Sequence, residues 1–221
     1  METSKKAQLV DIMENIKEMR RAMDAGTHAF RHIYRASNLR LLFLLAGCCV
    51  LIFTTAYHVL LQIYDYHLLI PQSVKTTYWV LLILAWLMLV GLRTHLTLKA
   101  GRELVKDLSV LGLIKLILSS RLWLAIVPVL LVLVILPFKM FPYLPKHFCV
   151  PYIAIVSGII CNMGGVGIRV FEYSVMGYWL IVTGLFGIFF VVMPIHIAVA
   201  VNFAPACFLF AFLAYIKGKE S

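Results

Sequence analysis

Residues 41–63 read LLFLLAGCCVLIFTTAYHVLLQI and contain no charged side chain. An α-helix of about 20 apolar residues is long enough to cross the ~30 Å hydrocarbon core of a bilayer. Comparable apolar stretches recur along the chain, in which 62% of the 221 residues are hydrophobic and 14% are charged. The sequence therefore predicts an all-α polytopic membrane protein rather than a soluble one.

Six transmembrane helices, paired as three hairpins, account for the apolar stretches. We place the hairpins at residues 41–96, 122–168 and 175–216. The last of these blocks is too long for one tilted span, and we divide it near Pro194 and His196. Polar segments separate the hairpins, and we expect a cytoplasmic amphipathic helix over 1–40, a cytoplasmic interfacial helix over 97–121, a cytoplasmic turn over 169–174 and a cytoplasmic tail over 217–221.

The distribution of basic residues predicts the orientation. If the N terminus is cytoplasmic, all but three of the 20 lysines and arginines lie inside, and the exceptions are Lys75, Lys139 and Lys146. Short cytoplasmic segments of membrane proteins are enriched in lysine and arginine, so we expect both termini inside. The exterior loops are short and the chain has no Asn-x-Ser/Thr site, which favours a bacterial inner (plasma) membrane.

The N-terminal segment carries a regular apolar seam. Its members alternate at spacings of three and four residues, as on one face of a helix: Leu9, Ile12, Ile16, Met19 and Met23. The polar faces mix acidic with basic residues, whereas a membrane-surface helix carries mainly lysine and arginine. The seam is therefore a candidate partner-binding surface, and the alternative is a helix lying on the protein's own cytoplasmic face.

Few polar side chains fall within the predicted spans. Thr54, His58 and Gln62 are four residues apart in the first span, and Asn162 and Asn202 lie in the fourth and sixth. Polar groups inside a membrane usually face the interior of the bundle and often mark function. These five residues either hydrogen-bond a neighbouring helix or line a transport pathway.

Four of the 7 histidines map to the outer leaflet or the exterior loops: His58, His67, His147 and His196. If the bundle brings them together, they form a transition-metal site or provide axial ligands to a haem. Against this, no two of them have metal-ligand spacing, and the exterior side offers only the carboxylate of Asp65. We therefore predict no cofactor, and keep a haem or metal site as an alternative.

Small residues follow one face of the fourth span, among them Gly158 and Gly165, and recur in the last two spans. Such faces let helix backbones approach closely. The run of glycines over 164–167 is either part of this packing surface or an opening in the helix that exposes backbone carbonyls to a solute.

The absence of catalytic patterns argues against an enzyme. No Asp or Glu is predicted deep in a span, with Asp65 and Glu172 among the interfacial ones, and the chain has neither G-x-S-x-G nor H-E-x-x-H. The 5 cysteines include no CxxC pair, so neither a zinc site nor a redox pair is indicated.

Three functions remain compatible with the sequence. The first is a non-catalytic subunit or assembly partner of a larger inner-membrane complex. The others are a small-solute or ion transporter with a pathway in spans one, four and six, and a haem- or quinol-binding membrane anchor. The expected partners are the lipid bilayer and other membrane or cytoplasmic subunits, with a homo-oligomer as an option. The net charge of +10 is explained by lysine and arginine at the cytoplasmic face, and we expect no nucleic-acid partner.

Overall fold

A computed structural model of the chain describes residues 34–102, 127, 131, 146–190 and 193–219. The N-terminal seam over residues 9–23 lies outside this part of the chain. The same is true of the third predicted span, apart from residues 127 and 131, and of the predicted interfacial helix beyond Arg102.

The described part is all helical. Its long helices are α2 (Ala36–Tyr64), α3 (Gln72–Arg102), α6 (Cys149–Ile168), α7 (Phe171–Phe189) and α8 (Ile195–Lys219), and two 3-10 turns, η1 (His67–Leu69) and η2 (Lys146–Phe148), precede α3 and α6. Each of these 5 helices is long and apolar enough to cross a membrane. The predicted all-α class, with long apolar helices that could span a membrane, is therefore confirmed. The helices overlap the first, second, fourth, fifth and sixth predicted spans, while the total of six depends on residues outside the description.

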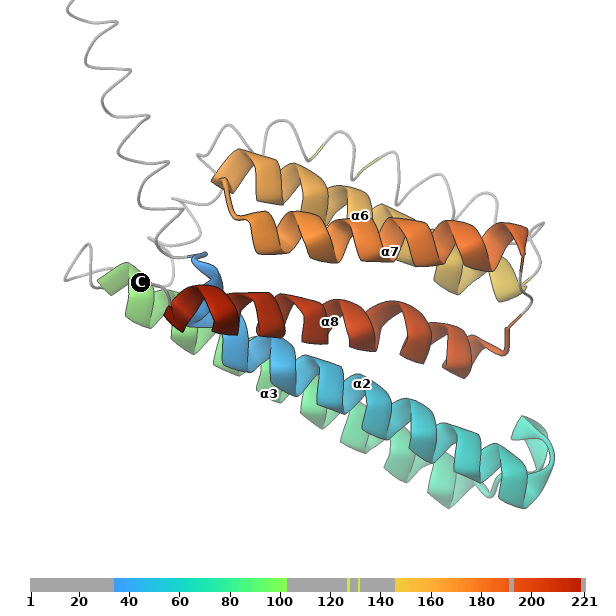
Figure 1. The fold of residues 1–221 in the computed structure, drawn as a ribbon. Helices are drawn as coiled ribbons and strands as arrows, with labels where there is room; N and C mark the ends of the chain where they lie inside the picture. The colour runs from blue at the N-terminus through green and yellow to red at the C-terminus, as the bar shows by residue number, and fades with distance from the viewer. Residues whose placement is uncertain (1–33, 103–126, 128–130, 132–145, 191–192, 220–221) are drawn as a thin grey trace, which may run out of the picture.

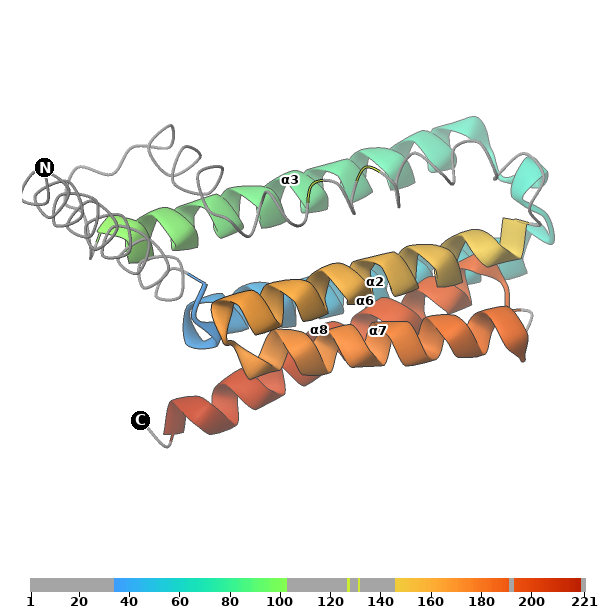
Figure 2. The same ribbon diagram turned by 90° about the horizontal axis from the view of Figure 1, so that it is seen from above.

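Helix α8 lies between two helix pairs (Figure 1). It packs against α2 on one side and α7 on the other, and α6 pairs with α7. Helix α3 packs mainly against α2, and Figure 2 shows it at the edge of the bundle. The last helix in the chain thus joins the two pairs.

The α6–α7 hairpin is held by direct backbone contact at glycines. A Cβ atom built on Gly158 would lie 2.6 Å from the carbonyl oxygen of Gly177, and one built on Gly177 would lie 2.6 Å from the carbonyl oxygen of Gly158. A Cβ built on Gly165 would lie 2.5 Å from Oγ of Ser174, whereas one built on Gly164 would meet no other part of the protein within 4 Å. The small-residue face predicted for the fourth span is therefore used inside the hairpin. Helix α6 continues to Ile168, so the glycine run does not open it.

An aromatic cluster joins three helices near one end of the bundle. Phe210 of α8 is fully buried, and its ring centroid lies 4.0 Å from that of Phe43 in α2 and 4.8 Å from that of Tyr173 in α7. Close by, Arg40 and Lys219 both lie over the ring of Tyr215, at 5.2 and 4.8 Å from its centroid. These contacts fix the start of α2 against the end of α8.

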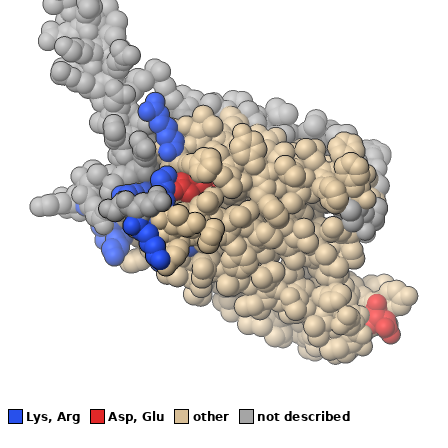
Figure 3. Space-filling model, viewed as in Figure 1, with Lys and Arg blue, Asp and Glu red and all other residues tan. Residues whose placement is uncertain are grey.

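Charged residues divide the bundle into two ends. Most of the described basic residues lie where α2 begins and where α3, α6 and α8 end, and we call this the basic end: Arg35, Arg40, Arg93, Lys99, Arg102, Arg169, Lys217 and Lys219. Figure 3 shows the blue side chains gathered there. Lys75 and Asp65 lie at the opposite end, which we call the histidine end because it holds His58, His67, His147 and His196.

Candidate functional site

Two of the predicted site histidines meet although 138 positions separate them. Nδ1 of His58 in α2 lies 3.0 Å from Nε2 of His196 at the start of α8. Nε2 of Gln62, one turn further along α2, lies 3.1 Å from Nε2 of His58. The spacing of four places His58 and Gln62 on one face of α2, and packing against α8 brings that face to His196.

These contacts are consistent with one chain of hydrogen bonds between uncharged groups. If the amide of Gln62 donates to Nε2 of His58, that imidazole carries its proton on Nδ1 and donates it to Nε2 of His196. A neutral imidazole has one donor and one acceptor. In this arrangement His58 accepts from Gln62 and donates to His196. The contact between His58 and His196 therefore joins α2 to α8, and Gln62 holds the His58 ring in place.

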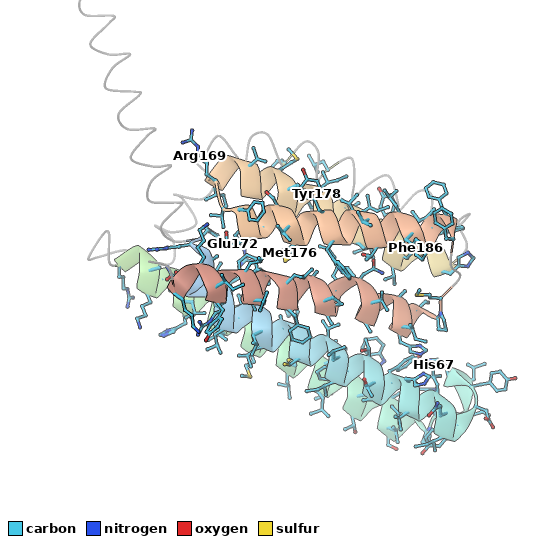
Figure 4. All side chains as sticks on the ribbon, viewed as in Figure 1. His67, Arg169, Glu172, Met176, Tyr178 and Phe186 are labelled. Atoms are coloured by element: carbon cyan, nitrogen blue, oxygen red, sulfur yellow. The ribbon has the colours of Figure 1, made fainter. Side chains whose placement is uncertain are left out.

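His67 extends this group from the tip of the α2–α3 hairpin, where Figure 4 labels it. The hydroxyl of Tyr57 lies 3.0 Å from Nδ1 of His67, and the Tyr57 ring centroid lies 5.8 Å from that of His196. His147, in η2, lies elsewhere, beside α7 and α8. The four histidines thus reach the same end of the bundle but do not form one cluster.

The histidine contacts offer little to a metal or haem. Among the described residues, no group of three or more His, Cys, Asp or Glu side chains is arranged to hold a metal ion. The facing ring nitrogens of His58 and His196 bond each other, and axial ligation of one haem iron by this pair would require them to separate. The arrangement fits a structural hydrogen-bond chain better than a metal centre.

The other predicted pathway residues take no part in the hydrogen bonds among His58, Gln62 and His196. Thr54 donates its hydroxyl to the carbonyl oxygen of Val50 in its own helix, at 2.7 Å. Asn162 packs against α7, where its Cγ lies 2.9 Å from the position of a Cβ on Gly177. The structure therefore brings together His58, Gln62 and His196, and leaves Thr54 and Asn162 in other contacts.

Asn202 lines a cavity between α6, α7 and α8 that sequence reasoning did not identify. The cavity measures about 270 Å³. Its walls come from the histidine-end halves of the three helices and include Pro151, Val182, Phe186 and Val201. The polar side chains that line it are those of His147, Trp179, Thr183 and Asn202. Residues far apart in sequence contribute, so no local pattern indicates the cavity.

Two polar atoms of the cavity residues are buried without a partner. Asn202 is 3% exposed and donates through Nδ2 to the carbonyl oxygen of Ala198 at 2.7 Å, but its Oδ1 accepts no hydrogen bond from the described residues. The indole Nε1 of Trp179 is likewise buried and unpaired. The hydroxyl of Thr183 donates a hydrogen bond to the carbonyl oxygen of Trp179, at 2.8 Å.

Glu172 is buried between helices, which the sequence did not indicate. As expected of a residue that is not deep in a span, it lies in the first turn of α7 at the basic end, and it is 2% exposed. Its Oε1 lies 3.2 Å from Nζ of Lys217 in α8, and its Oε2 is buried with no hydrogen-bond partner in the described part of the chain. Figure 4 labels it where α7 lies over α8, and that packing buries it.

We expect the His58–His196 contact to appear as an energetic coupling. Replacing either histidine by alanine should lower the free energy of unfolding by about 1 kcal/mol, because each change leaves the other ring without its partner. The loss of unfolding free energy in the double variant should be smaller than the sum of the losses in the two single variants, by about 0.6–1.7 kcal/mol. Unfolding of the purified protein in detergent, followed by circular dichroism, measures the difference.

A second pair of variants controls this comparison. His95 lies in α3 toward the basic end and is exposed, so His58→Ala and His95→Ala should act additively. Additive effects for His58 and His196 would contradict the contact.

No family model, no curated protein and no solved structure matches this chain. The function must therefore be argued from the residues and their contacts.

Proposed function

We propose that the chain is a non-catalytic subunit of a larger membrane complex and assembles through α3 with a transmembrane helix of another polypeptide. The observation that carries this proposal is the exposure of Trp86. This residue lies near the middle of α3, and 61% of its surface is exposed.

The position of Trp86 along α3 favours a protein neighbour over lipid. Tryptophan concentrates at the two membrane interfaces, where its indole N–H reaches water or lipid headgroups. In the middle of the hydrocarbon core, lipid tails offer that N–H no acceptor. A neighbouring helix both covers the ring and supplies an acceptor, and buried tryptophans are among the strongest contributors to interfaces.

The rest of α3 is consistent with such a neighbour. The residues it buries are Thr97, Ala100 and Gly101, all near the basic end. Toward the histidine end, an open groove of about 810 Å³ separates α3 from α2. Most of the side chains that line it are apolar, and Thr55, Ser73 and Tyr78 are among the polar ones. Because the glycine faces are used between α6 and α7, the α3 side is the better candidate for a partner.

The orientation belongs to the same proposal. We place the basic end in the cytoplasm of a bacterial inner membrane, with both termini inside and six spans in total. Its support is the gathering of basic residues at the end where α2 begins and α8 ends, which follows the bias of cytoplasmic segments. The anionic lipid of that leaflet adds attraction.

Photo-crosslinking in native membranes tests the partner. With p-benzoyl-phenylalanine at position 86, we expect one adduct of defined mass that contains a second polypeptide. The same residue at position 212 is the matched control, because Phe212 of α8 is 60% exposed. An adduct of two copies of this chain, or products with lipid alone, would overturn the proposed partner.

A second candidate function is binding or transport of a small solute. The cavity between α6, α7 and α8 favours it, because two unpaired polar atoms belong to residues of its wall.

A further inference from the structure

We propose that the outer surface between α2 and α8 binds one anionic phospholipid. Its phosphate lies among Arg40, Tyr215 and Lys219 at the basic end, and an acyl chain lies in the apolar groove that continues from them. This site goes beyond the proposed function, because it does not involve the partner at α3. Only its assignment to the cytoplasmic leaflet rests on the proposed orientation.

Two cations meet at one aromatic ring where α2 begins and α8 ends (Figure 1). Cζ of Arg40 lies 5.2 Å and Nζ of Lys219 lies 4.8 Å from the ring centroid of Tyr215, so the two charges are at most the sum of these distances apart. All three residues are exposed, and the exposed fraction of Tyr215 is 45%. A ligand outside the bundle can therefore reach them.

No carboxylate in the described part of the chain balances this pair of charges. The acidic residues there are Asp65, at the histidine end, and Glu172, which is buried and pairs with Lys217. Like charges so close repel each other, and an anion beside both offsets the repulsion. A phosphate suits the position, because guanidinium and ammonium groups form charge-assisted hydrogen bonds with its oxygens and the hydroxyl of Tyr215 is a further donor.

An open groove of about 670 Å³ follows the contact between α2 and α8. None of the residues that line it has a polar side chain, and they are Leu51 of α2 and Ala200, Val201, Ala204, Pro205, Phe208, Leu209 and Phe212 of α8. Such a lining offers hydrocarbon contact and no hydrogen bond from a side chain, so it suits an acyl chain and not a headgroup.

Helical spacing places the cations on the same faces as the groove. In α8, Tyr215 follows Phe212 by three residues and Lys219 follows Tyr215 by four, which is the spacing of one helix face. In α2, Arg40 and Leu51 are eleven residues apart, close to three full turns. The groove therefore opens toward the cations, with Phe212 one turn below Tyr215.

The length of the groove favours a lipid chain over a transmembrane helix of another protein. From Phe212 to Ala200 it covers twelve residues of α8, about 18 Å at 1.5 Å per residue. The two leaflets share a hydrocarbon core of ~30 Å, so this length is close to that of one acyl chain, whereas a spanning helix needs the whole thickness. A molecule with one anionic end and one apolar chain matches both parts of the site.

Native mass spectrometry of the purified full chain in detergent tests the headgroup. We expect phosphatidylglycerol to bind about fivefold more tightly, or better, than phosphatidylcholine with the same acyl chains. The choline group is itself a cation and meets Arg40 and Lys219, whereas glycerol adds no charge. Equal binding of the two lipids would overturn the proposal. So would displacement of phosphatidylglycerol by an equal concentration of glycerol 3-phosphate, because the groove would then contribute nothing.

Single variants test the two cations. Arg40→Gln and Lys219→Gln should each weaken phosphatidylglycerol binding about fivefold and leave phosphatidylcholine binding unchanged. Arg102→Gln is the matched control, because it removes one exposed cation from the same end of the bundle but at the end of α3. Unchanged binding in both site variants, or equal weakening by Arg102→Gln, would overturn the assignment.

A groove variant tests the position of the acyl chain. Leu209→Trp places a larger side chain in the groove and should cause a loss of bound phosphatidylglycerol, although no charge changes. Leu84→Trp is the control, since Leu84 of α3 is 55% exposed and does not line the groove. Equal lipid binding by the two variants would overturn the placement of the chain between α2 and α8.

Discussion

Gly158→Val is expected to force α6 away from α7 and to lower the free energy of unfolding by about 3 kcal/mol or more. The new Cβ would lie 2.6 Å from the carbonyl oxygen of Gly177 and 2.7 Å from Cγ1 of Ile181. A backbone oxygen cannot rotate away as the end of a side chain can. Overpacking of a close contact costs about 1–3 kcal/mol where neighbours adjust, and more where backbone blocks the way.

Gly164→Val in the same helix is the control for this prediction. It introduces the same β-branched side chain into α6, but the Cβ meets nothing within 4 Å. Thermal unfolding in detergent should show a large loss of stability for Gly158→Val and a small change in stability for Gly164→Val. Equal losses at the two positions would mean that helix propensity, rather than the contact with α7, explains the effect.

The second large effect concerns the buried carboxylate at the basic end. Lys217→Met should lower the free energy of unfolding by about 1–3 kcal/mol, because it leaves Glu172 buried without its ion-pair partner. Removing one partner of a fully buried pair costs about 3–5 kcal/mol. The lower figure allows for the 63% exposure of the Lys217 side chain, since water screens an exposed charge.

Glu172→Gln gives the matching rescue. The amide has nearly the same shape as the carboxylate and carries no charge, so it should restore most of the stability lost in Lys217→Met. Chemical unfolding of the single and double variants measures this. A double variant as unstable as Lys217→Met would show that the lysine acts through other contacts and not through the charge of Glu172.

The sequence predicted the helical membrane class and the approximate bounds of the helices that the structure describes. Both depend on local properties: the length of an apolar run, and the positions of turns and charges along it. The division of residues 175–216 is an example, since α7 ends at Phe189 and α8 begins at Ile195, on either side of Pro194. The spacing of His58 and Gln62 likewise identified residues that share one face of α2.

The contacts of the candidate sites could not be predicted in this way. Glu172 was assigned to an interface from its position at the end of an apolar run, and it is buried because α8 crosses over the start of α7. The glycine face of α6 was expected to pack closely, but nothing in the sequence says that its neighbour is α7.

The amino-acid sequence by itself determined that this chain forms apolar helices with one basic end. The tertiary structure decided that His58 meets His196, that Glu172 is buried, and that Trp179 and Asn202 line one cavity. The physical reason is that hydropathy and periodicity are properties of a single helix, and they predict its length and its apolar face but not its neighbours. Contacts between helices depend on the rotation and tilt of each, which are set by how side chains far apart in the sequence pack together.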